Sequence, residues 1–138
     1  MELNNCFRTI RTLLVDDSPV IVAALKGFLA TQPYIELIGV ASSGDEAMRF
    51  LAQSEPDLIL IDVHLPGSNG LETTRLIRLR WPRTRVILMS GFYKDLSQIW
   101  PEVGASGYIY KPQIPVRFIE IVKPLFAGSE NRTICSGA

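Results

Sequence analysis

The sequence predicts an α/β fold in which a parallel five-stranded sheet is covered by helices on both faces. Segments with strand-like and helix-like patterns alternate five times along the chain, with crossovers of about twenty residues. The third strand segment, 58–61, is apolar at every position, as a central strand buried on both faces should be. Right-handed crossovers between parallel strands would place the helices on the two faces. The sequence therefore predicts a doubly wound fold.

The first strand is expected at 11–15, rich in branched residues. Ser18 and Pro19 indicate the start of a helix, because serine is a good N-cap and proline is tolerated at the first helical position. Pro33 is expected to end this helix. Its apolar spacing predicts an inward face made of Ile21, Ala24, Leu25, Phe28 and Leu29.

The second strand is expected at 34–40, where apolar and polar residues alternate. Ser43 should open the next helix, which 54–56 should break before the third strand. Along the rest of the chain we expect helices at 71–79 and 115–127, strands at 85–89 and 108–110, and a short helical stretch within 94–103.

Pro101 argues against a regular helix through the whole of 94–103. Proline cannot donate a backbone hydrogen bond and its ring opposes the carbonyl four residues back, at a cost of roughly 3 kcal/mol in a helix interior. The helix should begin late, with Ser97 or a later residue as its cap, or be one short turn followed by a loop. Trp100 should mark a break, because the residue before proline avoids the helical region. We expect Trp100 to be partly exposed as a partner contact; the alternative is packing over the fourth and fifth strands.

Composition limits the classes of function. The 138 residues suit one domain, and 14 basic residues balance 14 acidic ones, so no overall positive field attracts nucleic acid or an anionic membrane. Cys6 and Cys135 lie near the two ends without CxxC spacing, which indicates reduced thiols and neither a zinc site nor a redox motif. No signal peptide or membrane-spanning run is visible, so we expect a cytoplasmic protein.

Acidic residues follow two of the expected strands. Asp16 and Asp17 come after the first strand, and Asp62 ends the third. The carboxyl ends of parallel strands meet at the edge where open α/β sheets bind ligands. Three carboxylates there should require a cation, and an oxygen-only ligand set with room for water and phosphate favours Mg²⁺. The alternative is that all three are ordinary N-cap or turn aspartates.

Four motifs at successive strand ends resemble, in order and spacing, the signature of response regulator receiver domains. They are Leu14-Val15-Asp16-Asp17-Ser18-Pro19, Asp62-Val63-His64-Leu65-Pro66-Gly67-Ser68-Asn69-Gly70, Met89-Ser90-Gly91 and Tyr108-Ile109-Tyr110-Lys111-Pro112. The resemblance implies a flavodoxin-like (βα)5 fold with the strand order 2-1-3-4-5. Residues 1–127 would form the receiver domain, and 128–138 a polar tail or the start of a linker. The stretches 39–47, 70–72 and 104–108 look most like receivers joined to LuxR-type helix-turn-helix domains.

The resemblance also implies roles for the acidic residues. Asp62 would be the phosphoacceptor, whose carboxylate attacks phosphorus to form an acyl phosphate. Asp17 and Asp62 would bind Mg²⁺ directly, Asp16 would orient it through water, and the backbone carbonyl of His64 would complete the ligands. The His64 side chain is not expected to take part, because it should point away along the loop and Mg²⁺ prefers oxygen.

Three further residues complete the implied site. The ammonium of Lys111 would lie against the phosphoryl oxygens. Its loss is expected to impair signalling more than folding. The hydroxyl of Ser90 would donate to the phosphoryl group, and Tyr108 would turn inward to fill the space that Ser90 leaves. The alternatives are a solvated lysine, a helix-capping serine and a core aromatic residue.

The implied function is a receiver domain that accepts a phosphoryl group from a sensor histidine kinase and signals through its fourth helix, fifth strand and fifth helix. The same face could form a homodimer. Such a chain would bind neither nucleic acid nor membrane itself, would be the regulatory part of a transcriptional regulator, and would catalyse only its own phosphorylation and dephosphorylation. One alternative is a pseudo-receiver that signals without phosphorylation. Another is an aspartate-nucleophile phosphatase, which usually has a second acid where this chain has His64.

Overall fold

A single parallel sheet organises the computed structural model, which describes residues 9–92 and 96–126. Its strands are β1 (Ile10–Val15), β2 (Ile35–Ala41), β3 (Leu58–Asp62), β6 (Arg85–Ser90) and β7 (Gly107–Tyr110). They lie in the order β2-β1-β3-β6-β7, and all neighbours are parallel. Counted along the chain, this is the predicted order 2-1-3-4-5. The central position of β3, with all five residues buried, explains its apolar sequence.

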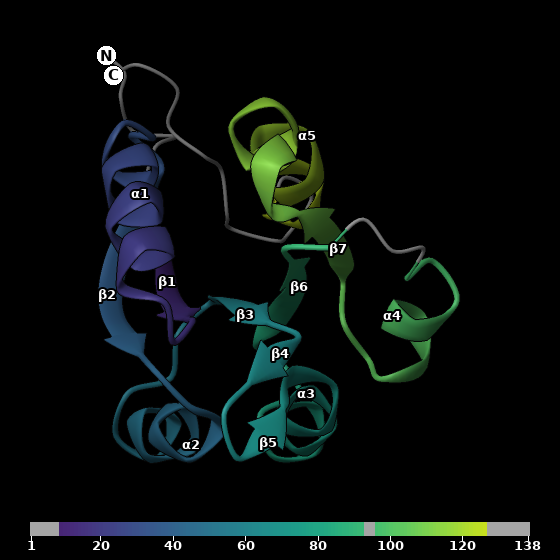
Figure 1. Cartoon of the computed structure of the whole chain (residues 1–138). Helices are drawn as coiled ribbons and strands as arrows, with labels where there is room; N and C mark the ends of the chain where they lie inside the picture. The colour runs from purple at the N-terminus through teal and green to yellow at the C-terminus, as the bar shows by residue number, and fades with distance from the viewer. Residues whose placement is uncertain (1–8, 93–95, 127–138) are drawn as a thin grey trace.

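Helices cover both faces of the sheet (Figure 1). One core cluster joins the sheet to α1 and α5, and the other joins it to α2, α3 and the segment around α4. The predicted doubly wound fold is confirmed. The helices are α1 (Pro19–Ala30), α2 (Gly44–Gln53), α3 (Gly70–Arg80), α4 (Ile99–Glu102) and α5 (Ile114–Phe126), with a 3₁₀ turn, η2 (Lys111–Gln113), before α5.

Side-chain caps explain where the long helices begin. The hydroxyl of Ser18 accepts from the Ile21 N–H at 3.3 Å, and Pro19 is the first residue of α1, as predicted. Ser43 caps α2 in the same way. One detail of the predicted α1 face is wrong: Ala24 is exposed, whereas Leu25 and Leu29 are buried and Ile21 and Phe28 are half-buried.

A small hairpin stands where the sequence predicted only a loop. Strands β4 (His64–Leu65) and β5 (Ser68–Asn69) pair antiparallel, and Gly67 takes a positive φ of 77° in the turn between them. The side chain of Asn69 then caps α3 by accepting from the Glu72 N–H at 2.7 Å. The helix consequently begins at Gly70, one residue earlier than expected.

The short helix α4 begins late within the 94–103 stretch, as expected from the position of Pro101. Its first residue is Ile99, and Pro101 lies in the first turn, where its missing N–H costs little. The expected break at Trp100 is wrong, because Trp100 is helical and its N–H donates to the Leu96 carbonyl at 3.0 Å. Trp100 is half-buried against the core on the α2, α3 and α4 side, so it is partly exposed as predicted.

Several expectations concern residues outside the described ranges. These are the cysteines Cys6 and Cys135, the beginning of the 94–103 stretch, and the tail at 128–138. Within 9–92 and 96–126, no helix combines the length and the apolar character needed to span a membrane.

Candidate functional site

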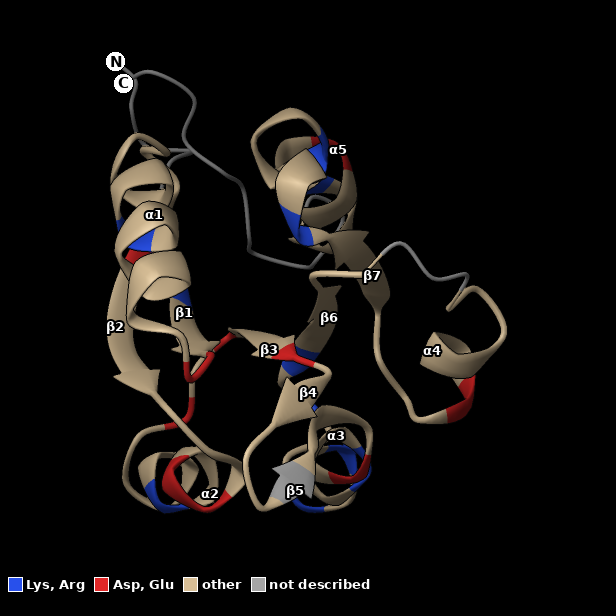
Figure 2. Ribbon diagram, viewed as in Figure 1, with Lys and Arg blue, Asp and Glu red and all other residues tan. Residues whose placement is uncertain are grey.

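Three carboxylates meet at the carboxyl ends of β1 and β3. The acidic segments that carry them are red on the ribbon in Figure 2. Val15 and Ile61 are register partners in these neighbouring parallel strands, so Asp16 and Asp62 follow at adjacent positions. One oxygen from each of Asp16, Asp17 and Asp62 lies within 4.8 Å of the other two. Asp16 and Asp62 are buried, with exposures of 1% and 5%, and Asp17 is exposed. The convergence expected from the sequence is present, and its oxygen donors could hold a metal ion.

Lys111 brings a positive charge into this cluster. Its Nζ lies 2.7 Å from Asp16 Oδ2 and 3.2 Å from Asp62 Oδ2, and only 12% of its side chain is exposed. The residue begins η2 directly after β7, which places it across the site from β1. The chain therefore supplies a cation of its own to two of the three carboxylates, although a metal ion was the only cation expected from their convergence.

The environment of Asp62 opposes ionisation. Burial raises the pKa of its carboxyl group, while the His64 N–H that donates to Oδ1 at 3.1 Å and the charge of Lys111 lower it, and the nearby Asp16 raises it. The net result is a raised pKa.

Ser90 and Tyr108 lie in the neighbouring strands β6 and β7. Ser90 ends β6 and is 3% exposed, and its hydroxyl accepts from the Phe92 N–H and donates to the Phe92 carbonyl, each at 3.1 Å. Tyr108 lies in β7 opposite Leu88 of β6 and is half-buried against the core. These positions are compatible with both the switch roles and the simpler capping and core roles expected from the sequence.

The His64 ring lies outside the carboxylate cluster. It is exposed and packs edge-on against the ring of Phe92, with 5.5 Å between ring centres. Phe92 itself is 65% exposed. Sequence reasoning gave Phe92 no role, because the pairing depends on how two loops from different strands approach each other.

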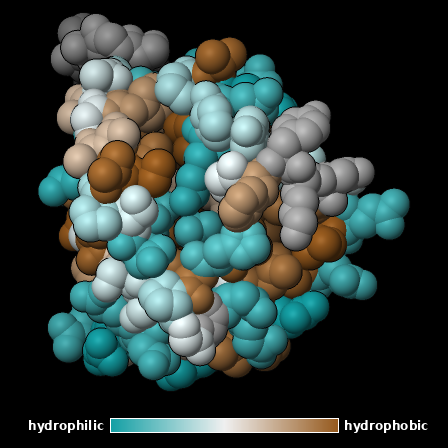
Figure 3. Space-filling view, viewed as in Figure 1, coloured by the Kyte–Doolittle hydropathy of each residue, from teal (hydrophilic) through white to brown (hydrophobic). Residues whose placement is uncertain are grey.

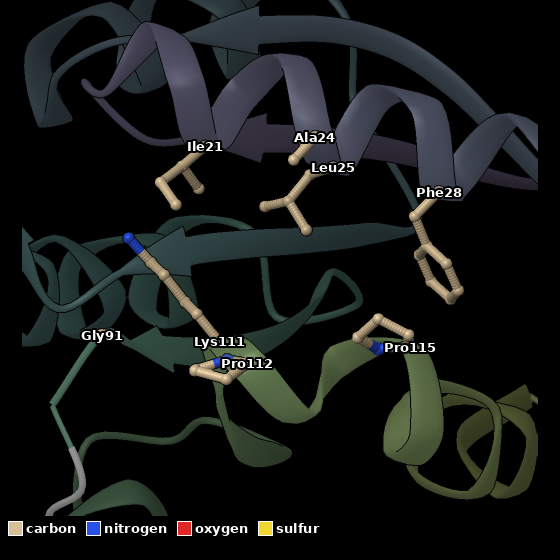
Figure 4. A pocket seen from close by; sticks show the side chains of 8 residues that line it. All are labelled: Ile21, Ala24, Leu25, Phe28, Gly91, Lys111, Pro112 and Pro115. Carbon is tan, nitrogen blue, oxygen red and sulfur yellow. The ribbon is translucent and has the colours of Figure 1, made fainter.

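An apolar groove opens beside the carboxylate cluster, between α1 and the β7 to α5 connection (Figure 4). Its volume is about 430 Å³. Ile21, Leu25 and Phe28 of α1 line one side and Pro115 lies opposite, while the Lys111 side chain extends across one end. In the space-filling view, hydrophobic residues also gather on the outer surface of α1 (Figure 3). Lys111, which lines this groove, also contacts Asp16 and Asp62 and so connects the groove to the carboxylate cluster.

Comparison with known proteins agrees with this geometry. Residues 12–123 match the family described as "Response regulator receiver domain". The transcriptional regulatory protein LiaR of Bacillus subtilis (strain 168) is 33% identical over 121 residues, which are 86% of this chain and 57% of LiaR. Protein-glutamate methylesterase/protein-glutamine glutaminase 1 of Syntrophus aciditrophicus (strain SB) is 36% identical over 115 residues, 81% of this chain and 33% of that protein.

A solved structure is also similar along most of its length. The crystal structure of a LuxR-family two-component response regulator from Aurantimonas sp. SI85-9A1 superposes with a TM-score of 0.80 at 28% identity, covering 94% of this chain and 91% of that one. The curated relatives are longer: this chain spans about a third to somewhat over a half of their lengths.

Proposed function

Because this chain belongs to the family of response regulator receiver domains, we propose that it accepts a phosphoryl group from a sensor histidine kinase on Asp62. The observation that carries the proposal is the contact of one ammonium group, Lys111 Nζ, with both Asp16 and Asp62 beside the exposed Asp17. Family membership alone does not say which aspartate reacts. Asp62 is favoured because it ends the central strand and its two oxygens meet separate donors, the His64 N–H and Lys111 Nζ.

The donor set suits Mg²⁺. Carboxylate oxygens within 4.8 Å of one another, one of them exposed, match a hard ion that keeps several waters. Asp16, Asp17, Asp62 and the backbone carbonyl of His64 would hold it. When bound, Mg²⁺ would neutralise negative charge on the phosphoryl oxygens.

The chain's own residues supply positioning and charge. An Asp62 oxygen attacks phosphorus as the bond to the donor's imidazole nitrogen breaks, and the His64 N–H steadies the other carboxylate oxygen. Lys111 moves its contact from the carboxylate to the incoming phosphoryl oxygens. Ser90 exchanges its bond to the Phe92 carbonyl for one to the phosphoryl group, and Tyr108 fills the vacated space.

The groove beside Lys111 is the proposed seat of the kinase. Its apolar lining suits side chains of a helix, and Lys111 at one end of it contacts the carboxylate that would receive the phosphoryl group. The face formed by α4, β7 and α5 is the proposed output and homodimer surface, where Val116 and Ile119 of α5 are 79% and 43% exposed.

The name of one relative suggests the process in which the whole protein takes part. LiaR is named a transcriptional regulatory protein, so a role for this chain in controlling transcription from the cytoplasm belongs to the proposal. No specific observation favours the pseudo-receiver or the phosphatase.

Incubation with acetyl phosphate followed by intact mass measurement tests the proposal. Wild type should gain one phosphoryl mass in the presence of Mg²⁺, and Asp62→Asn should gain none. Asp57→Asn, which changes an aspartate just before the same strand, is the matched control and should be labelled. Equal labelling of wild type in a chelator, or labelling of Asp62→Asn, would contradict the assignment.

A further inference from the structure

Gly70, the first residue of α3, packs directly against the main chain of Asp62. A Cβ placed on Gly70 would overlap the Asp62 carbonyl oxygen and would lie 3.0 Å from both the Asp62 carbonyl carbon and the Val63 Cα. All three are backbone atoms, so they cannot turn aside as the end of a flexible side chain could. A larger residue at this position must therefore displace either α3 or the segment that carries Asp62.

The main chain of Val63, directly after Asp62, is hydrogen-bonded on both sides. On one side the Val63 N–H donates to the Met89 carbonyl of β6 at 2.9 Å. On the other side the Gly70 N–H donates to the Val63 carbonyl at 2.8 Å, and Asn69 anchors the start of α3 through its cap. Displacement by a Cβ would strain at least one of these bonds.

The Asp62 side chain depends on the position of the main chain at 62 and 63. Its two oxygens meet different partners, the His64 N–H at 3.1 Å and Lys111 Nζ at 3.2 Å, so a rotation of the backbone would disturb both contacts. We propose that Gly70 is a positioning residue for phosphoryl transfer: its lack of a side chain lets α3 begin against Asp62 and holds the carboxylate beside Asp16 and Lys111. This inference rests on the proposed phosphorylation of Asp62.

The expected effect follows from the demands of the reaction. Transfer needs the attacking oxygen in line with the breaking bond, and a displacement of about 1 Å can slow a reaction roughly a hundredfold. Gly70→Ala should therefore reduce the rate of labelling by acetyl phosphate about tenfold or more. It should also weaken Mg²⁺ binding measured by titration calorimetry, because one of the proposed ligand oxygens moves.

Two control variants separate positioning from general damage. Gly27→Ala makes the same substitution in α1, where nothing lies within 4 Å of the new Cβ, and should be labelled within about twofold of wild type. Ile77→Ala removes a fully buried side chain from α3 and adds no atom near Asp62. It should lower the melting temperature, yet be labelled at nearly the wild-type rate at a temperature where it is folded.

Each outcome decides the inference. A folded Gly70→Ala that is labelled like wild type would overturn it, as would an equal slowing in Ile77→Ala. If Gly70→Ala does not fold, NMR of the wild type with Mg²⁺ and beryllofluoride replaces it. The Gly70 amide signal should then shift while that of Gly27 stays, and an unmoved Gly70 signal would overturn the inference. Failure to label wild type would instead reject the proposed function, and this inference with it.

Discussion

Removing the ammonium of Lys111 should destabilise the protein and not only impair signalling. In Lys111→Met, an apolar side chain of similar length replaces a cation that lies 2.7 Å and 3.2 Å from two buried carboxylates. Taking one partner from a buried ion pair costs about 3–5 kcal/mol. Because the Lys111 side chain keeps 12% of its exposure, solvent should lessen the loss to about 2–3 kcal/mol. This revises the expectation, drawn from the sequence, of a nearly normal melt.

The assay is thermal unfolding in a chelator, with Lys26→Met as control. Lys26 is exposed on α1 and forms no ion pair with any residue the structure describes. At about 3–4 °C per kcal/mol for a chain of this size, Lys111→Met should melt roughly 6–12 °C below wild type. The control should melt within about 2 °C of wild type.

Dependence on pH and Mg²⁺ provides an internal check. Without Lys111, the pKa of Asp62 should rise further above its unfolded value. A raised folded pKa contributes stability below the unfolded pKa that is lost as the pH rises through the folded pKa. The difference in melting temperature between wild type and Lys111→Met should therefore be largest at neutral pH and shrink towards about pH 4. Mg²⁺ should also reduce this difference. Equal melting of the two lysine variants in chelator would refute the reasoning.

Three further expectations concern other parts of the molecule. Burial raises the pKa of Tyr34 from 10.0 to about 12, so the stability that Tyr34 contributes should hold below pH 10 and fall between about pH 10 and 12. Urea unfolding of Tyr34→Phe should not show this fall in stability. An equal fall in Tyr34→Phe and wild type would exclude Tyr34 as the cause. Asp17→Ala should raise the melting temperature slightly in chelator, since Asp17 is an exposed member of a like-charged cluster, and a lower melting temperature would contradict this relief of repulsion. Trp100→Ala should weaken self-association measured by sedimentation, because Trp100 is partly exposed on the proposed output face; unchanged association would leave it a packing residue.

The features predicted correctly from the sequence depend on local pattern or on simple topology. The apolar run 58–61 is typical of a strand covered on both faces, and the cap at Ser18 marks the start of its helix without reference to the rest of the chain. Asp16 and Asp62 meet because parallel strands bring their carboxyl ends to one edge.

The features that were missed depend on distances between loops. The motif placed Lys111 after the last strand, but its double contact with Asp16 and Asp62 requires the turn of η2 to aim the side chain back across the sheet. The hairpin of β4 and β5 has only two residues in each strand, too few for an alternating pattern. Trp100 stays helical because its hydrogen bond and core contacts outweigh the local preference of a residue before proline.

The central claim is that one aspartate, Asp62, carries the phosphoryl group. Borohydride reduces an acyl phosphate of aspartate to homoserine, so reduction after acetyl phosphate treatment, followed by peptide mass sequencing, marks the modified residue directly. The proposal predicts homoserine at position 62 and unchanged aspartate at positions 16 and 17. Homoserine at Asp16 or Asp17, or reduction distributed among the three, would contradict it.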